Sequence, residues 1–225
     1  MAMPASALTR VNRLGFVNCY LVQEDDGLTL VDTMIPGSAK RILAAAERVG
    51  APIVRIALTH AHGDHIGSLD ALAAALPDAE VLISTRDARL LAKDMAFEPG
   101  EGGKLRGGYP GAKTKPTRTL EPGDRVGSLE VVASPGHTPG HVSFLDTRDR
   151  TLITGDAYTT LGGVRTTAKP SFPFPLAALS TWDRERELAS AKALRALNPS
   201  RLAPGHGKIV EAPGAAMDRA IAKAG

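Results

Sequence analysis

Three of the six histidines in this chain lie in one short segment, Thr59-His60-Ala61-His62-Gly63-Asp64-His65. The segment follows a β-branched apolar run over residues 53–59, which predicts a buried strand. His60 and His62 are two residues apart, so an extended backbone would direct both imidazoles to one side, where a single metal ion could bind them. Asp64 and His65 are adjacent and cannot both point in that same direction. They suit a second metal ion a short distance away.

Three further polar residues stand just past predicted strands, each enclosed by glycine or proline. His137 lies in Ser134-Pro135-Gly136-His137-Thr138-Pro139-Gly140-His141, Asp156 in Thr154-Gly155-Asp156, and His206 in Ala203-Pro204-Gly205-His206-Gly207. Tight turns at strand ends are a common way for a fold to present side chains to a shared cleft. The sequence therefore predicts seven metal ligands: His60, His62, Asp64, His65, His137, Asp156 and His206.

This combination of imidazoles and carboxylates favours zinc, with iron or manganese as alternatives. Two divalent metal ions about 3.5 to 4 Å apart would bind a water between them and convert it to hydroxide at neutral pH. That hydroxide could attack a carbonyl or a phosphoryl centre. We expect Asp64 to be the catalytic residue that orients the nucleophile and passes its proton to the leaving group.

The elements that must position these residues alternate along the chain. Alternation of helices and strands predicts a layered α/β architecture in a single domain over residues 1–225. The expected strands cover residues 18–23, 28–32, 53–59, 81–84, 129–133, 142–145, 151–154 and 201–203. The expected helices cover residues 38–49, 68–76, 86–95, 176–197 and 213–224.

Composition narrows the class of protein. Hydrophobic residues make up 43% of the chain, but no apolar run approaches the roughly 18 to 20 residues of a membrane span. We expect neither a signal peptide nor a membrane partner, and we expect a cytoplasmic location. The single cysteine, Cys19, excludes an intrachain disulfide and is expected in a buried strand. A net charge of +3 is too small to indicate a nucleic-acid partner. The expected partner is a small-molecule substrate, and a homo-oligomer is compatible with the sequence.

Residues 97–118 form the most unusual segment. Five basic residues stand against two acidic ones, which gives the segment the whole net charge of the chain. Long loops inside a compact domain usually have a function or lack order. We expect this loop to border the active site and to favour anionic substrates. The alternative is a solvent-exposed loop whose lysines have no role at the site. Its basic residues are Lys104, Arg106, Lys113, Lys115 and Arg118, and its glycines are Gly100, Gly102, Gly103, Gly107, Gly108 and Gly111.

Together these motifs resemble the metallo-β-lactamase fold superfamily, over nearly the whole chain from the strand Leu28-Thr29-Leu30-Val31-Asp32-Thr33 to Gly205-His206-Gly207. The resemblance implies a four-layer αββα sandwich of two mixed sheets with helices outside. It implies a first metal held by His60, His62 and His137, and a second held by Asp64, His65 and His206. Asp156 would bridge the two metals and Asp32 would steady a ligand, whereas His141 would not be a ligand.

The resemblance also narrows the reaction. A bridging aspartate at position 156 is similar to glyoxalase II thioesterases, lactonases and phosphodiesterases rather than to true β-lactamases of this fold. Only a short segment follows His206, which argues against the helical glutathione-binding domain of glyoxalase II. We favour a dinuclear hydrolase that attacks an ester, lactone or thioester carbonyl. The alternatives are a phosphodiesterase or nuclease, and a mononuclear iron oxygenase of the persulfide dioxygenase type. Phe172, Phe174 and Trp182 could line an acyl pocket or pack in the core.

Overall fold

The computed structural model describes residues 8–225, and its first half is a set of strands covered by helices on one face. Helix α1 shows why the local structure forms: its buried residues Ile42, Ala45 and Ala46 lie on one face, and Gly50 ends it with a left-handed φ of 84°. The strands are β1 (Leu8–Arg13), β2 (Val17–Glu24), β3 (Gly27–Val31), β4 (Ile53–Ala57), β5 (Glu80–Ser84) and β6 (Arg118–Leu120). The helices are α1 (Ala39–Val49), α2 (Gly63–Ile66), α3 (Leu69–Ala75) and α4 (Thr85–Leu91).

The second half of the chain differs from the prediction at one helix. The helix predicted over residues 176–197 is interrupted, because Asp183 leaves helical geometry and its side chain accepts hydrogen bonds from the N–H groups of Glu185 and Arg186, so a new helix begins there. The strands are β7 (Arg125–Val126), β8 (Leu129–Ala133), β9 (Val142–Asp146), β10 (Thr151–Thr159), β11 (Arg165–Thr166), β12 (Arg201–His206) and β13 (Val210–Glu211). The helices are α5 (Leu176–Leu179), α6 (Arg184–Ala196) and α7 (Gly214–Ala224).

The strands form one large, curled, mixed sheet. Its order is β6-β5-β4-β3-β2-β12-β10-β9-β8-β7, with β1, β11 and β13 paired at the side. Strands β3 to β6 are parallel to one another, and β10 is parallel to β12. The two halves are joined where His206 of β12 pairs with Val17 of β2. The mixed α/β class is confirmed, and hydrogen bonding joins the described strands in a single sheet, whereas the resemblance implied two sheets.

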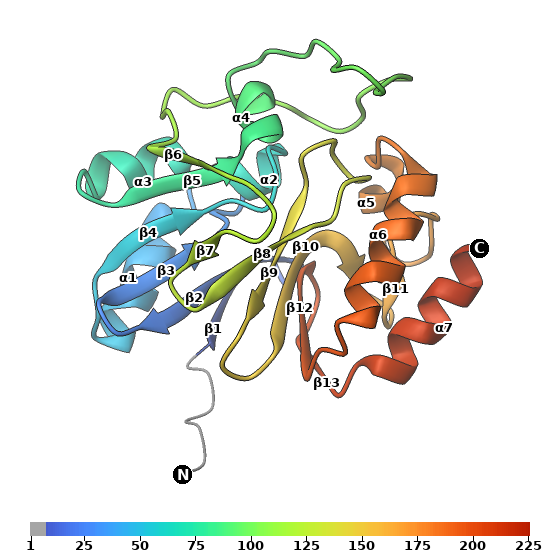
Figure 1. Ribbon diagram of the computed structural model, residues 1–225. Helices are drawn as coiled ribbons and strands as arrows, with labels where there is room; N and C mark the ends of the chain where they lie inside the picture. Colours follow the sequence, from blue (N-terminus) through green and yellow to red (C-terminus); the bar gives the residue numbers. More distant parts are fainter. Residues whose placement is uncertain (1–7) are drawn as a thin grey trace.

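Alternate side chains along a strand pack into different apolar clusters of the core. In β2, Cys19 and Leu21 pack against the helices of the first half, whereas Tyr20 and Val22 face the strands of the second half. Strand β12 behaves likewise, with Leu202 packed toward α6 and α7 and Ala203 toward the other strands. Figure 1 shows α1 and α3 on one side of the strands and α6 and α7 on the opposite side. The central strands are therefore buried on both faces.

The polar segments of the sequence gather at one edge of this arrangement. Asp32 follows β3, the segment 59–65 follows β4, His137 lies between β8 and β9, and His206 is the last residue of β12. The loop between α4 and β6 passes over the top of the molecule in Figure 1. None of the helices within residues 8–225 has the length and apolar character needed to cross a membrane.

Candidate metal centre

The seven residues that the sequence singled out lie together in the structure. They form two groups in which the potential ligand atoms are all within 4.8 Å of one another. The first group, called here the three-histidine group, is His60, His62 and His137. The second, called here the mixed group, is Asp64, His65, Asp156 and His206.

Asp156 connects the two groups. Its Oδ2 atom lies 3.4 Å from Nε2 of His137, in the three-histidine group, and 3.2 Å from Nε2 of His206, in the mixed group. Its Oδ1 atom lies 3.2 Å from Nε2 of His65. The backbone must come very close for this arrangement, since a Cβ atom on Gly205 would stand 2.5 Å from Oδ1 of Asp156. Only glycine fits at position 205.

Each of the five histidines in these groups has its outer ring nitrogen in contact with a hydrogen-bond acceptor. Such a contact sets the tautomer, because the outer nitrogen carries the proton and the inner nitrogen keeps a lone pair for a metal ion. His62 presents Nδ1 to the centre and the other four present Nε2. The acceptors are Thr59 Oγ1 for His60 (3.0 Å), Arg106 O for His62 (2.9 Å), Asp32 Oδ2 for His65 (2.8 Å), Thr181 Oγ1 for His137 (3.1 Å) and Phe16 O for His206 (3.1 Å).

The inner atoms show what the cluster suits chemically. Nε2 of His60 is buried and makes no hydrogen bond, and Nε2 of His65 and Oδ1 of Asp156 are buried 3.2 Å apart without the geometry of a hydrogen bond. Buried polar atoms without partners are rare and costly unless a ligand binds them. The inner nitrogens of His62 and His137 are also only 2.9 Å apart, as expected where two imidazoles converge on one point. The residues present therefore fit divalent metal ions.

Electrostatics differ between the two groups. Burial lowers the pKa of His60 and of His137, so both imidazoles are held in the neutral form that binds metal ions. Burial acts in the same direction on His65, but the nearby carboxylates, Asp156 first, outweigh it and raise the pKa of His65. Burial raises the pKa of Asp64, yet His65 and His206 outweigh that effect and lower it below its usual value. The mixed group thus holds ionised carboxylates.

Asp32, expected to steady a ligand, contacts the mixed group directly and the three-histidine group through Thr59. Its carboxylate accepts from Nδ1 of His65 and from the backbone N–H and hydroxyl of Thr59. Since the Thr59 hydroxyl donates to Asp32, its oxygen is free to accept the Nδ1–H of His60. Asp32 thereby fixes His65 directly and His60 through Thr59.

His141 differs from the other five histidines because neither of its ring nitrogens faces the side chain of another candidate ligand. Its Nδ1 lies 2.8 Å from Ser134 Oγ, and its Nε2 accepts from the backbone N–H of Asp156 at 3.1 Å. It therefore has no lone pair directed at the centre, and it supports the backbone that carries Asp156.

The sequence reasoning missed Asp87. This fully buried residue accepts from the backbone N–H of Ala61 at 2.9 Å, from Thr138 Oγ1 at 2.8 Å and from the backbone N–H of Gly140 at 2.9 Å. It therefore ties the loop carrying His60 and His62 to the turn carrying His137. Ser84 and Asp87 are spaced as in a helix capping box, and Ser84 does accept the Asp87 N–H. That local pattern conceals the long-range role of the Asp87 side chain.

A cavity of about 380 Å³ opens onto both groups. The loop predicted to border the site does so, but through its backbone and Pro110. The backbone of Gly108 accepts from the N–H of Gly63, and a Cβ atom on Gly107 would lie 2.4 Å from Nε2 of His62. The cavity is lined by Phe16, His62, Gly63, Asp64, Gly108, Pro110, His137, Asp156, Phe174, Leu176, Ala177, Ser180 and His206.

Comparison with known proteins identifies the family. The sequence profile of the metallo-beta-lactamase superfamily matches residues 12–206, a span that contains all seven candidate ligands. The chain belongs to the metallo-β-lactamase superfamily. The chain is also 47% identical over 210 residues to the uncharacterized protein YobT of Bacillus subtilis (strain 168), covering 92% of this chain and 90% of YobT.

Two further relatives of the superfamily bear on chemistry. A hydroxyacylglutathione hydrolase of Xanthomonas axonopodis pv. citri (strain 306) is 34% identical over 142 residues, which are 63% of this chain and 46% of that enzyme. The chain thus matches about half the length of that relative. The crystal structure of TTHA1623 in a di-iron-bound form superposes with a TM-score of 0.65 and 29% identity, covering 92% of this chain and 95% of TTHA1623. The relatives with named activities are hydrolases, and the protein is a metal-dependent hydrolase of this superfamily, as the sequence predicted.

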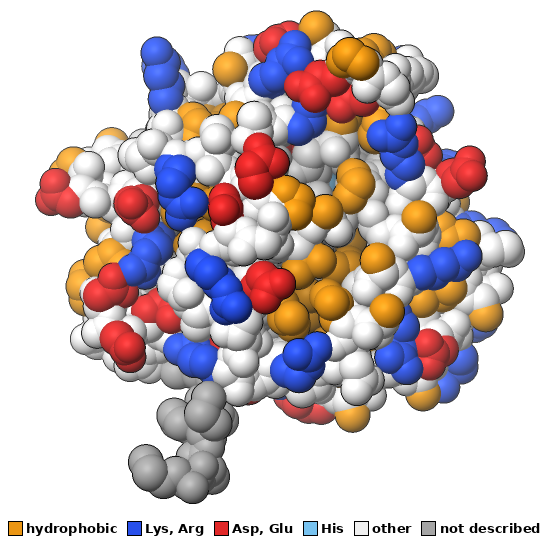
Figure 2. Space-filling model, in the orientation of Figure 1, with side chains coloured by type: hydrophobic (Ala, Val, Ile, Leu, Met, Phe, Trp, Pro, Cys, Tyr) orange, Lys and Arg blue, Asp and Glu red, His pale blue; other side chains and the backbone are white. Residues whose placement is uncertain are grey.

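The face of this metallo-β-lactamase superfamily member seen in Figure 2 carries no continuous basic surface. Lysine and arginine side chains alternate there with aspartate and glutamate, around an apolar central area. Mixed charge of this kind gives no long track for a phosphate backbone.

Proposed function

We propose that this superfamily member uses two divalent metal ions to hydrolyse an ester, lactone or thioester carbonyl. The observation that carries the proposal is the position of Asp156, whose Oδ2 faces a histidine of each group while Oδ1 faces His65. A carboxylate so placed suits a bridge between two ions. The three-histidine group would hold one ion and the mixed group the other, with zinc favoured by the ligand set and iron as the alternative.

Ions bound in these groups would lower the pKa of a water molecule and polarise a carbonyl oxygen. Side chains of the protein would orient the attacking water and transfer its proton. Asp64 lines the cavity with 38% of its side chain exposed, so it alone among the carboxylates of the mixed group reaches toward solvent. Its lowered pKa keeps it ionised and able to accept a hydrogen bond from an attacking water. We assign it the role of orienting that water and passing a proton to the leaving group.

The surroundings would maintain the ligand geometry through the reaction. Asp32, Thr181 and the carbonyl oxygens of Arg106 and Phe16 hold the outer ring nitrogens, so the imidazoles cannot rotate away. Low-mobility ligands matter because misplacing reacting groups by about 1 Å can cost on the order of 100-fold in rate.

Two features of the predicted architecture also stand as proposals. Residues 1–225 would form a single domain, and the two halves of the sheet would be the inner layers of an αββα sandwich. The second proposal is supported by the three apolar clusters, one between each half and its helices and one between the halves. In such a sandwich the single sheet would fold back on itself where His206 of β12 pairs with Val17 of β2.

Metal analysis of freshly purified protein tests the proposed function. We expect two ions per chain, and we expect His137→Ala and His206→Ala each to lose one of them. Leu179→Ala, an exposed position that does not line the cavity, serves as the control and should keep both. One ion per chain in metal-replete protein, with consumption of oxygen instead of hydrolysis, would favour the oxygenase alternative and overturn the proposal.

A further inference from the structure

Beyond the metal groups, the cavity has an apolar wall made by Phe16, Phe174, Leu176 and Pro110. The Phe174 ring lies 4.8 Å from the ring of His206, and the Phe16 ring lies 6.3 Å from it in a stacked arrangement. The two phenylalanine rings are 6.2 Å apart. An aromatic surface therefore begins directly beside a candidate metal ligand.

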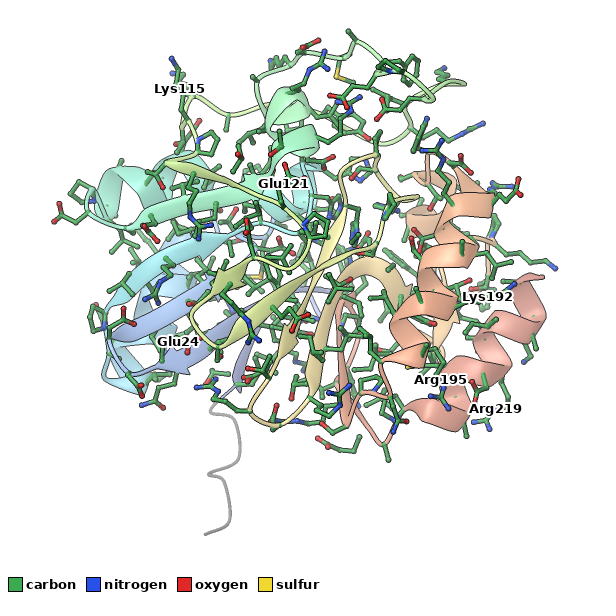
Figure 3. The ribbon with its side chains drawn as sticks, viewed as in Figure 1. Glu24, Lys115, Glu121, Lys192, Arg195 and Arg219 are labelled. Carbon is green, nitrogen blue, oxygen red and sulfur yellow. The ribbon has the colours of Figure 1, made fainter. Side chains whose placement is uncertain are left out.

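This wall carries no fixed positive charge. None of the cavity-lining residues in the described range 8–225 is lysine or arginine. Arg106 instead lines a different hollow of about 530 Å³, together with Arg184 and Arg186. Lys104, Lys113 and Lys115 are exposed, and Figure 3 shows Lys115 extending outward from the loop, away from the body of the molecule. The loop thus contributes backbone, and not cations, to the cavity.

The rim of the cavity leaves apolar surface in contact with solvent. Leu176 lines the cavity and yet is 60% exposed, whereas Phe172, four residues earlier, is 91% exposed but does not line the cavity. Large apolar side chains left exposed at the mouth of a cavity are typical of a binding site for an apolar ligand. Of the three aromatic residues considered for an acyl pocket, only Phe174 lines this cavity. Trp182 lines the other hollow and donates its Nε1–H to Gly102 O.

We propose that Phe16, Phe174 and Leu176 bind the apolar acyl group of an uncharged ester, lactone or thioester, next to the carbonyl that the metal centre attacks. The inference rests on the proposed function and names its substrate class. It separates this chain from its hydroxyacylglutathione hydrolase relative, because glutathione carries carboxylates and this cavity offers them no lysine or arginine among the described residues.

Hydrolysis of p-nitrophenyl esters of increasing acyl length tests the specificity in metal-replete enzyme. Each methylene that becomes buried should raise kcat/KM by about fourfold, the equivalent of about 0.8 kcal/mol, until the wall is covered. A charged thioester of glutathione should be hydrolysed at least about tenfold less efficiently than an uncharged thioester with the same acyl group. A flat dependence on acyl length, or a preference for the glutathione thioester, would overturn the inference.

Two leucines on the same short helix provide a matched pair of variants. Leu176→Ala should reduce the dependence on acyl length, lowering kcat/KM by about three- to tenfold more for long-chain esters than for acetyl esters. Leu179→Ala should change neither, since Leu179 is 50% exposed but does not line the cavity. Both positions are exposed, so neither substitution should prevent folding. Equal effects of the two variants would refute a specific role for Leu176.

Binding of carboxylates separates failure of this inference from failure of the proposed function. Octanoate should bind to the metal-replete protein more tightly than acetate, and Leu176→Ala should narrow that difference. If no ester is hydrolysed but the octanoate preference and its loss in Leu176→Ala are found, the apolar site stands and the proposed reaction fails. If esters are hydrolysed without an octanoate preference, the reaction stands and the apolar site fails.

Discussion

Replacing Asp87 with alanine should disorganise the three-histidine group without removing any ligand. The carboxylate of Asp87 accepts two backbone N–H groups and one hydroxyl, from Ala61, Gly140 and Thr138. Ala61 separates His60 from His62, and Thr138 follows His137. The loss of Asp87 therefore releases the loops that carry all three imidazoles.

The size of the effect follows from these contacts. A buried donor left without a partner costs about 1 to 3 kcal/mol, and the Thr138 hydroxyl can rotate to another acceptor while the two N–H groups cannot. We expect Asp87→Ala to lower the free energy of unfolding by about 3 to 5 kcal/mol. Asparagine keeps one acceptor oxygen but places an amide opposite an N–H group, so Asp87→Asn should cost about 1 to 3 kcal/mol.

Two measurements check this reasoning. Denaturant unfolding of the metal-free proteins gives the stability differences. Metal titration then shows whether binding is weakened at one group or both, and Asp87→Ala should weaken one ion of the pair by about 10- to 100-fold and spare the other. Asp70→Ala is the matched control, since the Asp70 carboxylate likewise accepts two backbone N–H groups and one hydroxyl, from Lys113 and Thr114, but neither contacts a candidate ligand nor lines the cavity. Equal weakening of both ions, or no weakening of either, would refute the assignment of Asp87 to the three-histidine group.

The remaining predictions concern charge. Asp64→Asn should abolish turnover more completely than it lowers total metal binding; near-normal activity would remove Asp64 from the mechanism. Burial raises the pKa of Asp87 to about 6 from its usual 3.8, so the folded protein binds the extra proton between these values. The stability of wild type relative to Asp87→Asn should therefore fall by about 2 kcal/mol as pH rises from 4 to 7, and a stability difference between the two proteins that stays constant across this range would contradict it. Since no lysine or arginine of the loop lines the cavity, replacing Lys104, Arg106, Lys113 and Lys115 with serine should leave KM unchanged for anionic and neutral substrates alike; a rise in KM confined to anionic substrates, shrinking at high salt, would show that the loop does act through its charge.

The sequence alone predicted most of the local structure. The apolar run before Thr59 and the apolar stretch around Cys19 specify buried strands, and Gly50 specifies the end of α1, because these signals depend on neighbouring residues. The spacing of His60, His62, Asp64 and His65 also indicated metal ligands without any knowledge of the fold. The structure brings these residues together with His137, Asp156 and His206.

Other features were hidden because local patterns have another explanation. The residues between α5 and α6 are compatible with one continuous helix, but Thr181 is required at the centre, where it contacts His137 and donates to Thr167 O. Asp87 resembles a capping residue, and only the folded chain brings it to Gly140. The basic composition of residues 97–118 predicted a charged wall, whereas the fold turns glycine backbone and Pro110 toward the cavity.

The tertiary structure determined the contacts between residues that are far apart in the chain. His62 meets the carbonyl of Arg106 across 44 residues, Asp87 meets Gly140 across 53, and His206 meets the carbonyl of Phe16 across 190. These contacts choose the ring nitrogen that faces the centre and the side chains that line the cavity. Residue type and spacing determine which groups can do chemistry, because those properties are local. Their tautomers, their charges and their access to substrate depend on packing, because burial and hydrogen-bond partners come from distant segments.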